Sequence, residues 1–284
     1  MDAKSLLFIG LGIGLLIWIV TVVRGGWVMP NLFQLSVGFV TAGLDTLGIG
    51  SFATTTAVFK LRNVVPVKLM PGTLNVGHTL ATIAQAFIYT RLVPVDTTTL
   101  VLMIAAACLG AWLGAGFIVH WDRRRIQIGM GLALAGAATV LLLQQLDLFP
   151  AGGATLDLRG VRLAIGLTGN FALGVLMMLG IGLYAPCMIL VSLLGMNPTA
   201  AFPIMMGSCA FLMPTSVVRF VKTGTYHRQA SWGLALGGVP AVLIAAYIIE
   251  SLPLGAVRVL VVCVVYYTAA NMLLTLGQAV STNA

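Results

Sequence analysis

The stretch "LDTLGIGSFATTT", residues 44–56, decides how this chain folds, because it interrupts an otherwise apolar run. It places two glycines, one acid, one serine and four threonines within thirteen residues. The apolar pieces on either side are about 12–16 residues long, whereas a helix that crosses a bilayer needs about 20. The stretch therefore predicts a break between two half-length helices.

The surrounding composition is that of a membrane protein. The 284 residues are 60% hydrophobic and 8% charged, whereas a soluble domain carries about 25% charged residues. Apolar runs long enough to span a bilayer recur along the chain, so we expect an all-α, polytopic membrane protein. The run at 6–23 lacks a signal-peptide cleavage site and is interpreted as a retained helix. The expected full-length segments are 6–23, 69–90, 98–119, 126–146, 201–221, 230–250 and 256–277.

Charge and motifs exclude several functions. The net charge of +8 is typical of positively charged cytoplasmic loops, so no nucleic-acid partner is expected. The four cysteines, Cys108, Cys187, Cys209 and Cys263, lie in apolar segments without a metal-ligand spacing, so we expect no metal and no cofactor. A Walker motif and the HExxH and GxSxG signatures are absent from the sequence, and we therefore do not expect an enzyme.

A second copy of the break lies in the other half of the chain. A shift of 132 residues aligns the LGIG at 47–50 with the LGIG at 179–182, and it also aligns Pro66 with Pro198 and Pro71 with Pro203. We therefore expect two diverged copies of one unit. The expected division is an N-terminal transmembrane helix at 1–30, a first repeat at 31–148, an external loop at 149–163 and a second repeat at 164–284.

The distribution of lysine and arginine favours one topology. If each broken segment crosses the membrane once, eight cations lie on one side and seven on the other. If each is a re-entrant hairpin and the N-terminus is outside, ten lie inside and five outside, which satisfies the positive-inside rule. The two repeats then have inverted orientations, each with one hairpin and three transmembrane helices, as in many secondary transporters. The C-terminus is expected inside.

The breaks are candidate anion sites. The half-helices that follow begin at about Ser51 and Leu183, and the free amides and positive dipole end of a helix N-terminus attract anions. Tight helix packing by glycine is the alternative explanation. The predicted substrate-binding residues are Gly48, Ile49, Gly50, Ser51, Thr54, Thr55, Gly180, Gly182, Leu183, Tyr184, Asn75, His78 and Ser208.

Two ionisable residues are candidates for proton coupling. Asp45 lies three residues before Gly48 inside an apolar segment, where acids are costly and often functional. His78 lies in the apolar run after Pro71 and could carry a proton. The alternatives are that Asp45 caps nearby amides and that His78 is a packing residue.

The two breaks resemble the motifs of a known family. The segments "LGIGLYAPCMILVSLLGMNPTAAF" at 179–202 and "GFVTAGLDTLGIGSFATTTAVFKL" at 38–61 are similar to the Gly-rich motifs of the TauE/SafE family of sulfite exporters, also called DUF81. The resemblance covers about 33–277. The family's usual triple glycine is Gly-Ile-Gly in both copies, and Thr54 stands where the second copy has Pro186.

The resemblance implies a secondary transporter of a small sulfur-containing anion, such as sulfite or an organosulfonate, coupled to protons across the cytoplasmic (inner) membrane. Other readings are a thiosulfate-type carrier that uses Cys187 or Cys209, an anion channel and an intramembrane enzyme. The expected partners are the anion, protons and the lipid bilayer, and homodimer assembly stays open.

Overall fold

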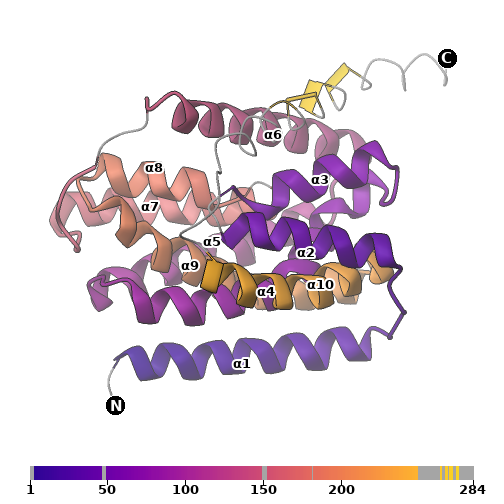
Figure 1. Cartoon of the computed structure of the whole chain (residues 1–284), viewed down its shortest axis with the longest axis horizontal. Helices are drawn as coiled ribbons and strands as arrows, with labels where there is room; N and C mark the ends of the chain where they lie inside the picture. Colours follow the sequence, from indigo (N-terminus) through magenta and orange to yellow (C-terminus); the bar gives the residue numbers. More distant parts are fainter. Residues whose placement is uncertain are drawn as a thin grey trace.

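The structure is a computed structural model that describes residues 3–46, 49–148, 152–180 and 182–248, together with Cys263, Tyr266, Tyr267, Ala269, Ala270, Leu273 and Leu274. In this part of the chain every regular element is a helix, apart from an isolated bridge between Thr155 and Met196. The helices lie mostly along the long axis of the molecule (Figure 1). The expected all-α class is confirmed, while the expected segment at 256–277 lies largely outside the described residues.

The helices form two sets with the same order. The first half holds α1 (Ala3–Arg24), α2 (Leu32–Thr46), α3 (Ser51–Leu61), the 3-10 turn η1 (Val67–Leu69), α4 (Met70–Leu92), α5 (Thr97–Ile118) and α6 (Arg123–Gln145). The second half holds α7 (Gly160–Met177), α8 (Tyr184–Leu193), the 3-10 turn η2 (Pro198–Ala200), α9 (Ala201–Thr223) and α10 (Arg228–Ile248). A helix, a break, a short helix, a 3-10 turn and two long helices thus follow each other in both halves.

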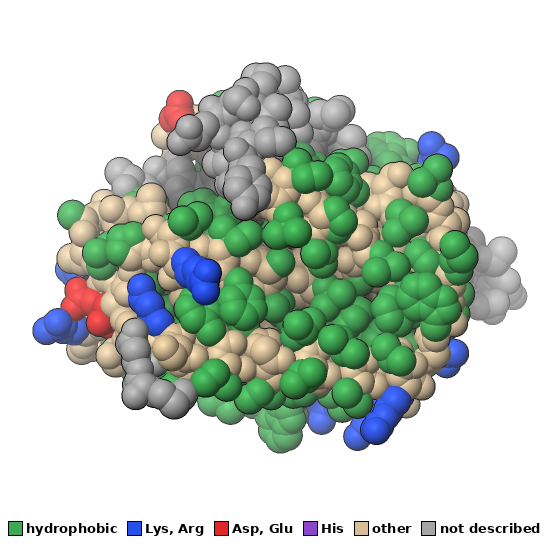
Figure 2. All heavy atoms as spheres, turned by 60° about the horizontal axis from the view of Figure 1, so that its bottom comes forward, with side chains coloured by type: hydrophobic (Ala, Val, Ile, Leu, Met, Phe, Trp, Pro, Cys, Tyr) green, Lys and Arg blue, Asp and Glu red, His purple; other side chains and the backbone are tan. Residues whose placement is uncertain are grey.

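Four helices in the described part of the chain are long and apolar enough to cross a membrane. They are Lys4–Arg24 in α1, Thr97–Ile118 (α5), Gly160–Met177 (α7) and Pro198–Thr223, which joins η2 to α9. Hydrophobic side chains also cover much of the face shown in Figure 2, and most charged side chains lie toward its edges. Exposed apolar surface of this extent is favourable in lipid and unfavourable in water. Fold and surface are consistent with a membrane protein.

The chain reverses direction at each break, so the outer ends of the two helices that flank the break lie at the same end of the bundle. The guanidinium carbon of Arg62, just after α3, lies 5.6 Å from the centroid of the Phe33 ring, at the start of α2. At the other hairpin, a Cβ on Gly195, just after α8, would lie 3.2 Å from Nη1 of Arg162, near the start of α7. Both half-helices therefore return to the end where their hairpin began, and Figure 1 shows the two hairpins at opposite sides of the view.

The two hairpins pack on helices of the other half. The first helix of one hairpin, α2, packs on α10, and its counterpart α7 packs on α5. Glycines permit these close approaches: a Cβ on Gly38 would lie 2.7 Å from the carbonyl oxygen of Gly233, and one on Gly174 would clash with the backbone of Ala107. The long helices α4 and α9 contact each other between these pairs. The hairpin tips are thereby held in the interior of the bundle.

Candidate functional site

A small cavity lies where the two hairpin tips meet. It measures about 10 Å³, which is about the space that one water molecule needs. The first tip contributes Asp45, Gly50, Ser51 and Phe52, the second contributes Met177, Gly182, Leu183 and Tyr184, and α4 and α9 add Thr82 and Cys209. The cavity is therefore built from both halves of the chain and has room for about one water molecule.

At the first tip, the chain reverses at Gly50 and Asp45 caps the helix that follows. Gly50 has φ +86°, a conformation that glycine adopts without strain. Oδ1 of Asp45 accepts a hydrogen bond from the backbone N–H of Ser51, the first residue of α3. Asp45 is buried, and no cationic partner is recorded for it within the described chain. The positive end of α3 is thus neutralised by the protein's own carboxylate.

Gln85 of α4 joins the two tips through its side-chain amide. Its Nε2 donates to Oδ2 of Asp45 at 3.1 Å and to Oγ1 of Thr46 at 3.0 Å. Its Oε1 accepts from the Tyr184 hydroxyl, on α8, at 2.7 Å. Both amide hydrogens are used on the first tip, so the orientation of Gln85 is fixed and its oxygen must face the second tip.

The second tip has no acid at its helix N-terminus. Met177 stands where the 132-residue shift places the counterpart of Asp45, and its side chain lines the cavity. The helix α8 begins at Tyr184 after Leu183, and no side chain caps it. The first amides of a helix have no intrahelical acceptor, so this end keeps its positive partial charge. Here the chain reverses at Gly180, with φ +90°, and not at Gly182.

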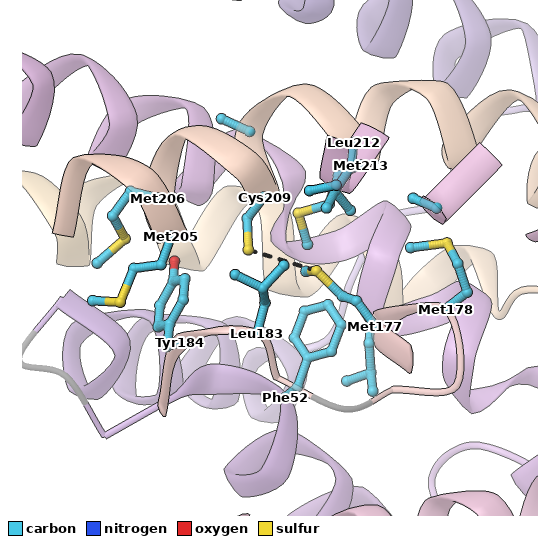
Figure 3. Packing of buried hydrophobic residues seen from close by; sticks show 14 of the residues in the cluster. Phe52, Met177, Met178, Leu183, Tyr184, Met205, Met206, Cys209, Leu212 and Met213 are labelled. Atoms are coloured by element: carbon cyan, nitrogen blue, oxygen red, sulfur yellow. Dashed lines mark hydrogen bonds between the residues drawn. The ribbon is translucent and has the colours of Figure 1, made fainter. Parts of the chain in front are cut away.

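Sulfur atoms surround the second tip (Figure 3). The thiol of Cys209, on α9, donates to Sδ of Met177 at 3.5 Å, and both residues line the cavity. Met178, Met205, Met206 and Met213 are buried nearby, in the same core cluster. Cys187 is also buried, on α8, but it is not among the residues that line the cavity. Of the two cysteines that the sequence analysis offered as reactive thiols, only Cys209 therefore lines the cavity.

His78 belongs to a separate buried cluster behind the first tip. Its Nε2 lies 2.9 Å from the hydroxyl of Thr55, which donates to the hydroxyl of Thr41, which in turn donates to the carbonyl of Val37. Each threonine hydrogen is then used, so Nε2 of His78 must carry the proton that it shares with Thr55. Nδ1 of His78 has no hydrogen-bond partner and is buried.

The predicted site residues divide into those that line the cavity and those that do not. Asp45, Gly50, Ser51, Gly182, Leu183 and Tyr184 line it. Ile49, Thr54, Thr55, Asn75, His78, Gly180 and Ser208 do not, and Gly48 lies outside the described residues. The Thr54 hydroxyl donates to the carbonyls of Gly50 and Ser51, and Asn75 Nδ2 donates to the carbonyl of Pro71. Ser208 accepts from Asn170 of α7.

Four cavity residues were missing from the predicted binding set, and one of them, Cys209, had been named only as a possible reactive thiol. Phe52 lies next to a predicted residue, and Thr82 lies one helical turn after His78 on α4. Met177 could have been found from the repeat, since it is the counterpart of Asp45, but its apolar side chain gave no chemical signal. Sequence patterns located the tips and missed the apolar residues that close the space between them.

Comparison with protein-family models, with curated proteins and with solved structures finds no match to this chain. Nor do the described residues include a group of three or more His, Cys, Asp or Glu side chains that could hold a metal ion. The geometry of the two tips is therefore the basis for a functional proposal.

Proposed function

We propose that this protein is a secondary transporter that moves a small sulfur-containing anion across the cytoplasmic membrane in symport with protons. The observation that carries the proposal is the meeting of the two hairpin tips at a buried cavity, one tip capped by an acid and the other uncapped. An uncapped helix N-terminus in a low-dielectric interior is a favourable place for an anion.

The two halves are proposed to be inverted repeats. Their elements recur in the same order, α2 packs on α10 as α7 packs on α5, and the two hairpins open toward opposite ends of the bundle. In transporters of this plan, the substrate binds at the midplane beside broken helices, and one repeat moves against the other. The N-terminus is proposed to lie outside and the C-terminus inside, because this places ten of fifteen cations inside.

Asp45 is the proposed proton-coupling group. While it is ionised, it competes with a substrate anion for the Ser51 amide and repels the anion electrostatically. Protonation removes the charge and weakens its hydrogen bond to Ser51, since charge-assisted bonds are the stronger ones. Anion binding and proton binding would then favour each other.

We assign this structure, whose cavity has room for about one water molecule, to a state between the inward-open and the outward-open states of the transporter. A sulfur oxyanion is larger than one water molecule, so the tips must separate before it can bind. Movement of Tyr184 with α8 would break its hydrogen bond to Gln85, while Asp45 would stay bound to Gln85. Opening thus changes the contacts of the second tip more than those of the first.

The proposed substrate class is sulfite or a small organosulfonate. The helix N-terminus suits the charged group, and the apolar side chains of Phe52, Met177 and Leu183 suit a small organic substituent. The resemblance of both breaks to the TauE/SafE motifs favours sulfur anions over other small anions.

A second candidate is a thiosulfate-type carrier, and the position of Cys209 favours it. Its thiol lines the cavity beside Met177. Once deprotonated, it could attack the sulfane sulfur of thiosulfate, so that the S–S bond breaks, sulfite leaves and a cysteine persulfide forms. Attack of sulfite on the outer persulfide sulfur reverses the step and regenerates thiosulfate and the thiolate. Replacing Cys209 with serine should then abolish thiosulfate transport, whereas Cys187→Ser should not. Full thiosulfate transport by Cys209→Ser would exclude the covalent mechanism.

The proposed function is tested in proteoliposomes that contain the purified full chain. Uptake of radiolabelled sulfite, thiosulfate and a small sulfonate is measured with and without a pH gradient. We expect uptake of at least one of these anions, stimulated by one direction of the gradient and abolished by a protonophore. Absence of uptake of all three, in vesicles that hold folded protein, would contradict the proposal.

A further inference from the structure

A pocket away from the hairpin tips carries two cations near the ends of α5 and α9. It encloses about 320 Å³, and its lining includes Trp112 of α5 and Arg219 and Lys222 of α9. The one ion pair recorded among the described residues joins Arg159 to Asp157, so neither pocket cation has an acidic partner there. Arg219 is half-buried, while Lys222 is exposed.

Arg219 is held across the surface of α5. Its Nη1 donates to the carbonyl of Trp112 at 3.1 Å, and its guanidinium carbon lies 5.9 Å from the centroid of the Trp112 ring. Gly116 makes room for this position, because a Cβ there would clash with Nη1. A guanidinium has five N–H donors, so Arg219 is oriented by α5 and keeps donors for a ligand.

The other polar groups of the pocket offer no competing donor or charge. The hydroxyl of Thr215 donates to the carbonyl of Leu212, and that of Thr223 donates to the carbonyl of Arg219. Asp122, in the connection after α5, is not among the residues that line the pocket. The N–H donors available in the pocket are therefore those of the two cations, which select an anionic group with several acceptor oxygens, such as a phosphate.

The pocket continues into an exposed apolar row on α5. The row consists of Leu109, Trp112, Leu113 and Phe117, which are 60%, 56%, 42% and 68% exposed and share one face of the helix by their spacing of three to four residues. Arg219 lies four residues before the end of α9, about 6 Å along the axis, so the cations lie near the level where this membrane-long helix ends.

We propose that this pocket binds the headgroup of an anionic phospholipid. The phosphate accepts from Arg219 and Lys222, and the acyl chains lie along the row Leu109–Phe117. A free phosphate ion would use the two cations but not the apolar row, and for this reason a lipid is the ligand that fits both. The site is independent of the anion that the protein transports.

The test measures the thermal unfolding of the purified full chain in detergent with added phosphatidylglycerol, phosphatidylcholine or inorganic phosphate. We expect phosphatidylglycerol alone to raise the unfolding temperature. The double variant Arg219→Gln/Lys222→Gln should weaken phosphatidylglycerol binding on the order of 25-fold, and Lys222→Gln, which changes an exposed residue, by about fivefold.

The matched control is Arg124→Gln/Arg125→Gln, which removes two exposed cations and leaves the pocket intact. It should bind phosphatidylglycerol as the wild type does. An equal loss in both double variants would show diffuse attraction to positive charge and would overturn the proposal. Equal stabilisation by inorganic phosphate, lost in the pocket variant, would also overturn it and assign the pocket to a soluble anion.

Discussion

The two hairpin tips share a motif and a chain reversal, but they differ at the helix N-terminus that each presents. In the first tip, Asp45 accepts from the amide of Ser51 and neutralises the start of α3. In the second tip, Met177 stands at the equivalent position, and no side chain caps the start of α8. The two breaks therefore present two helix N-termini, and one of them is already filled by a carboxylate.

The difference suggests a division of labour between the tips. The first carries a negative charge that a proton can remove, and the second offers positive partial charge to a substrate. Gln85 connects them, since its amide binds Asp45 on one side and Tyr184 on the other. A symmetric site with an acid at each tip would repel an anion twice, while a site with none would have no group to couple to protons.

Blocking the second tip is expected to have the largest effect. A Cβ on Gly182 would meet its nearest atom, Cβ of Phe52, at 3.9 Å, so Gly182→Ala should fold normally. Gly182→Leu adds a side chain larger than the cavity of about 10 Å³, so it should abolish anion transport and lower the stability by about 1–3 kcal/mol through overpacking, while the protein stays folded. Uptake assays and thermal unfolding measure the two effects.

The control for this change is Gly12→Leu, because a Cβ on Gly12 of α1 would meet no atom within 4 Å. It should leave transport unchanged. Normal transport by Gly182→Leu would mean that the second tip is a packing device, and the comparison between the tips would lose its functional meaning.

Removing the charge of the first tip should have the next largest effect. In Asp45→Asn, the amide group can accept from Ser51, but its NH₂ then faces the NH₂ of Gln85. One unsatisfied or reoriented donor costs about 1–3 kcal/mol of stability. Transport should lose its dependence on the pH gradient, which uptake measured at several external pH values would show. If the pH dependence of transport is unchanged in Asp45→Asn, Asp45 is not the proton-coupling group.

Loosening the connection between the tips should have a moderate effect. Tyr184→Phe removes the hydrogen bond to Gln85, which must break when the tips separate, and should therefore strengthen the apparent anion affinity by roughly two- to tenfold, the value of one neutral hydrogen bond. Tyr89→Phe removes a hydroxyl that donates to the carbonyl of Thr46 within the first tip and serves as the matched control. Binding titrations that give equal changes for both variants would indicate a general loss of packing.

Changing the cluster behind the first tip should have the smallest effect on coupling. His78→Gln removes the contact with Thr55 and should lower stability by about 0.5–1.5 kcal/mol. The pH dependence of transport should remain, because His78 does not line the cavity. If His78→Gln abolishes the pH dependence and Asp45→Asn preserves it, the histidine carries the proton.

The sequence predicted the helices and breaks closely, because apolar length and glycine clusters are local signals. The half-helix predicted to begin at about Ser51 begins there, and its counterpart begins at Tyr184, next to the predicted Leu183. The helix α7 is 18 residues long and exceeds the predicted half-length, since the apolar run alone did not mark its start at Gly160.

The contacts of the site could not be predicted to the same degree. The hydroxyl run at 54–56 was interpreted as ligand-facing, but a helix turns each hydroxyl in a different direction: Thr54 bonds to the backbone and Thr55 to Thr41. Likewise, the link from Asp45 to Tyr184 through Gln85 joins residues far apart in the chain. Such contacts depend on packing between helices, which periodicity does not encode.

The most direct test of the proposed transport function is the location of a bound anion. An experimental structure of the purified protein with selenite, the selenium counterpart of sulfite, would place the selenium atom by its anomalous scattering. The proposed function predicts a selenium atom between the tips, with selenite oxygens that accept from the amides at the start of α8, and loss of this selenium in Gly182→Leu. Selenium bound at another position, with the cavity between Ser51 and Tyr184 unchanged, would contradict it.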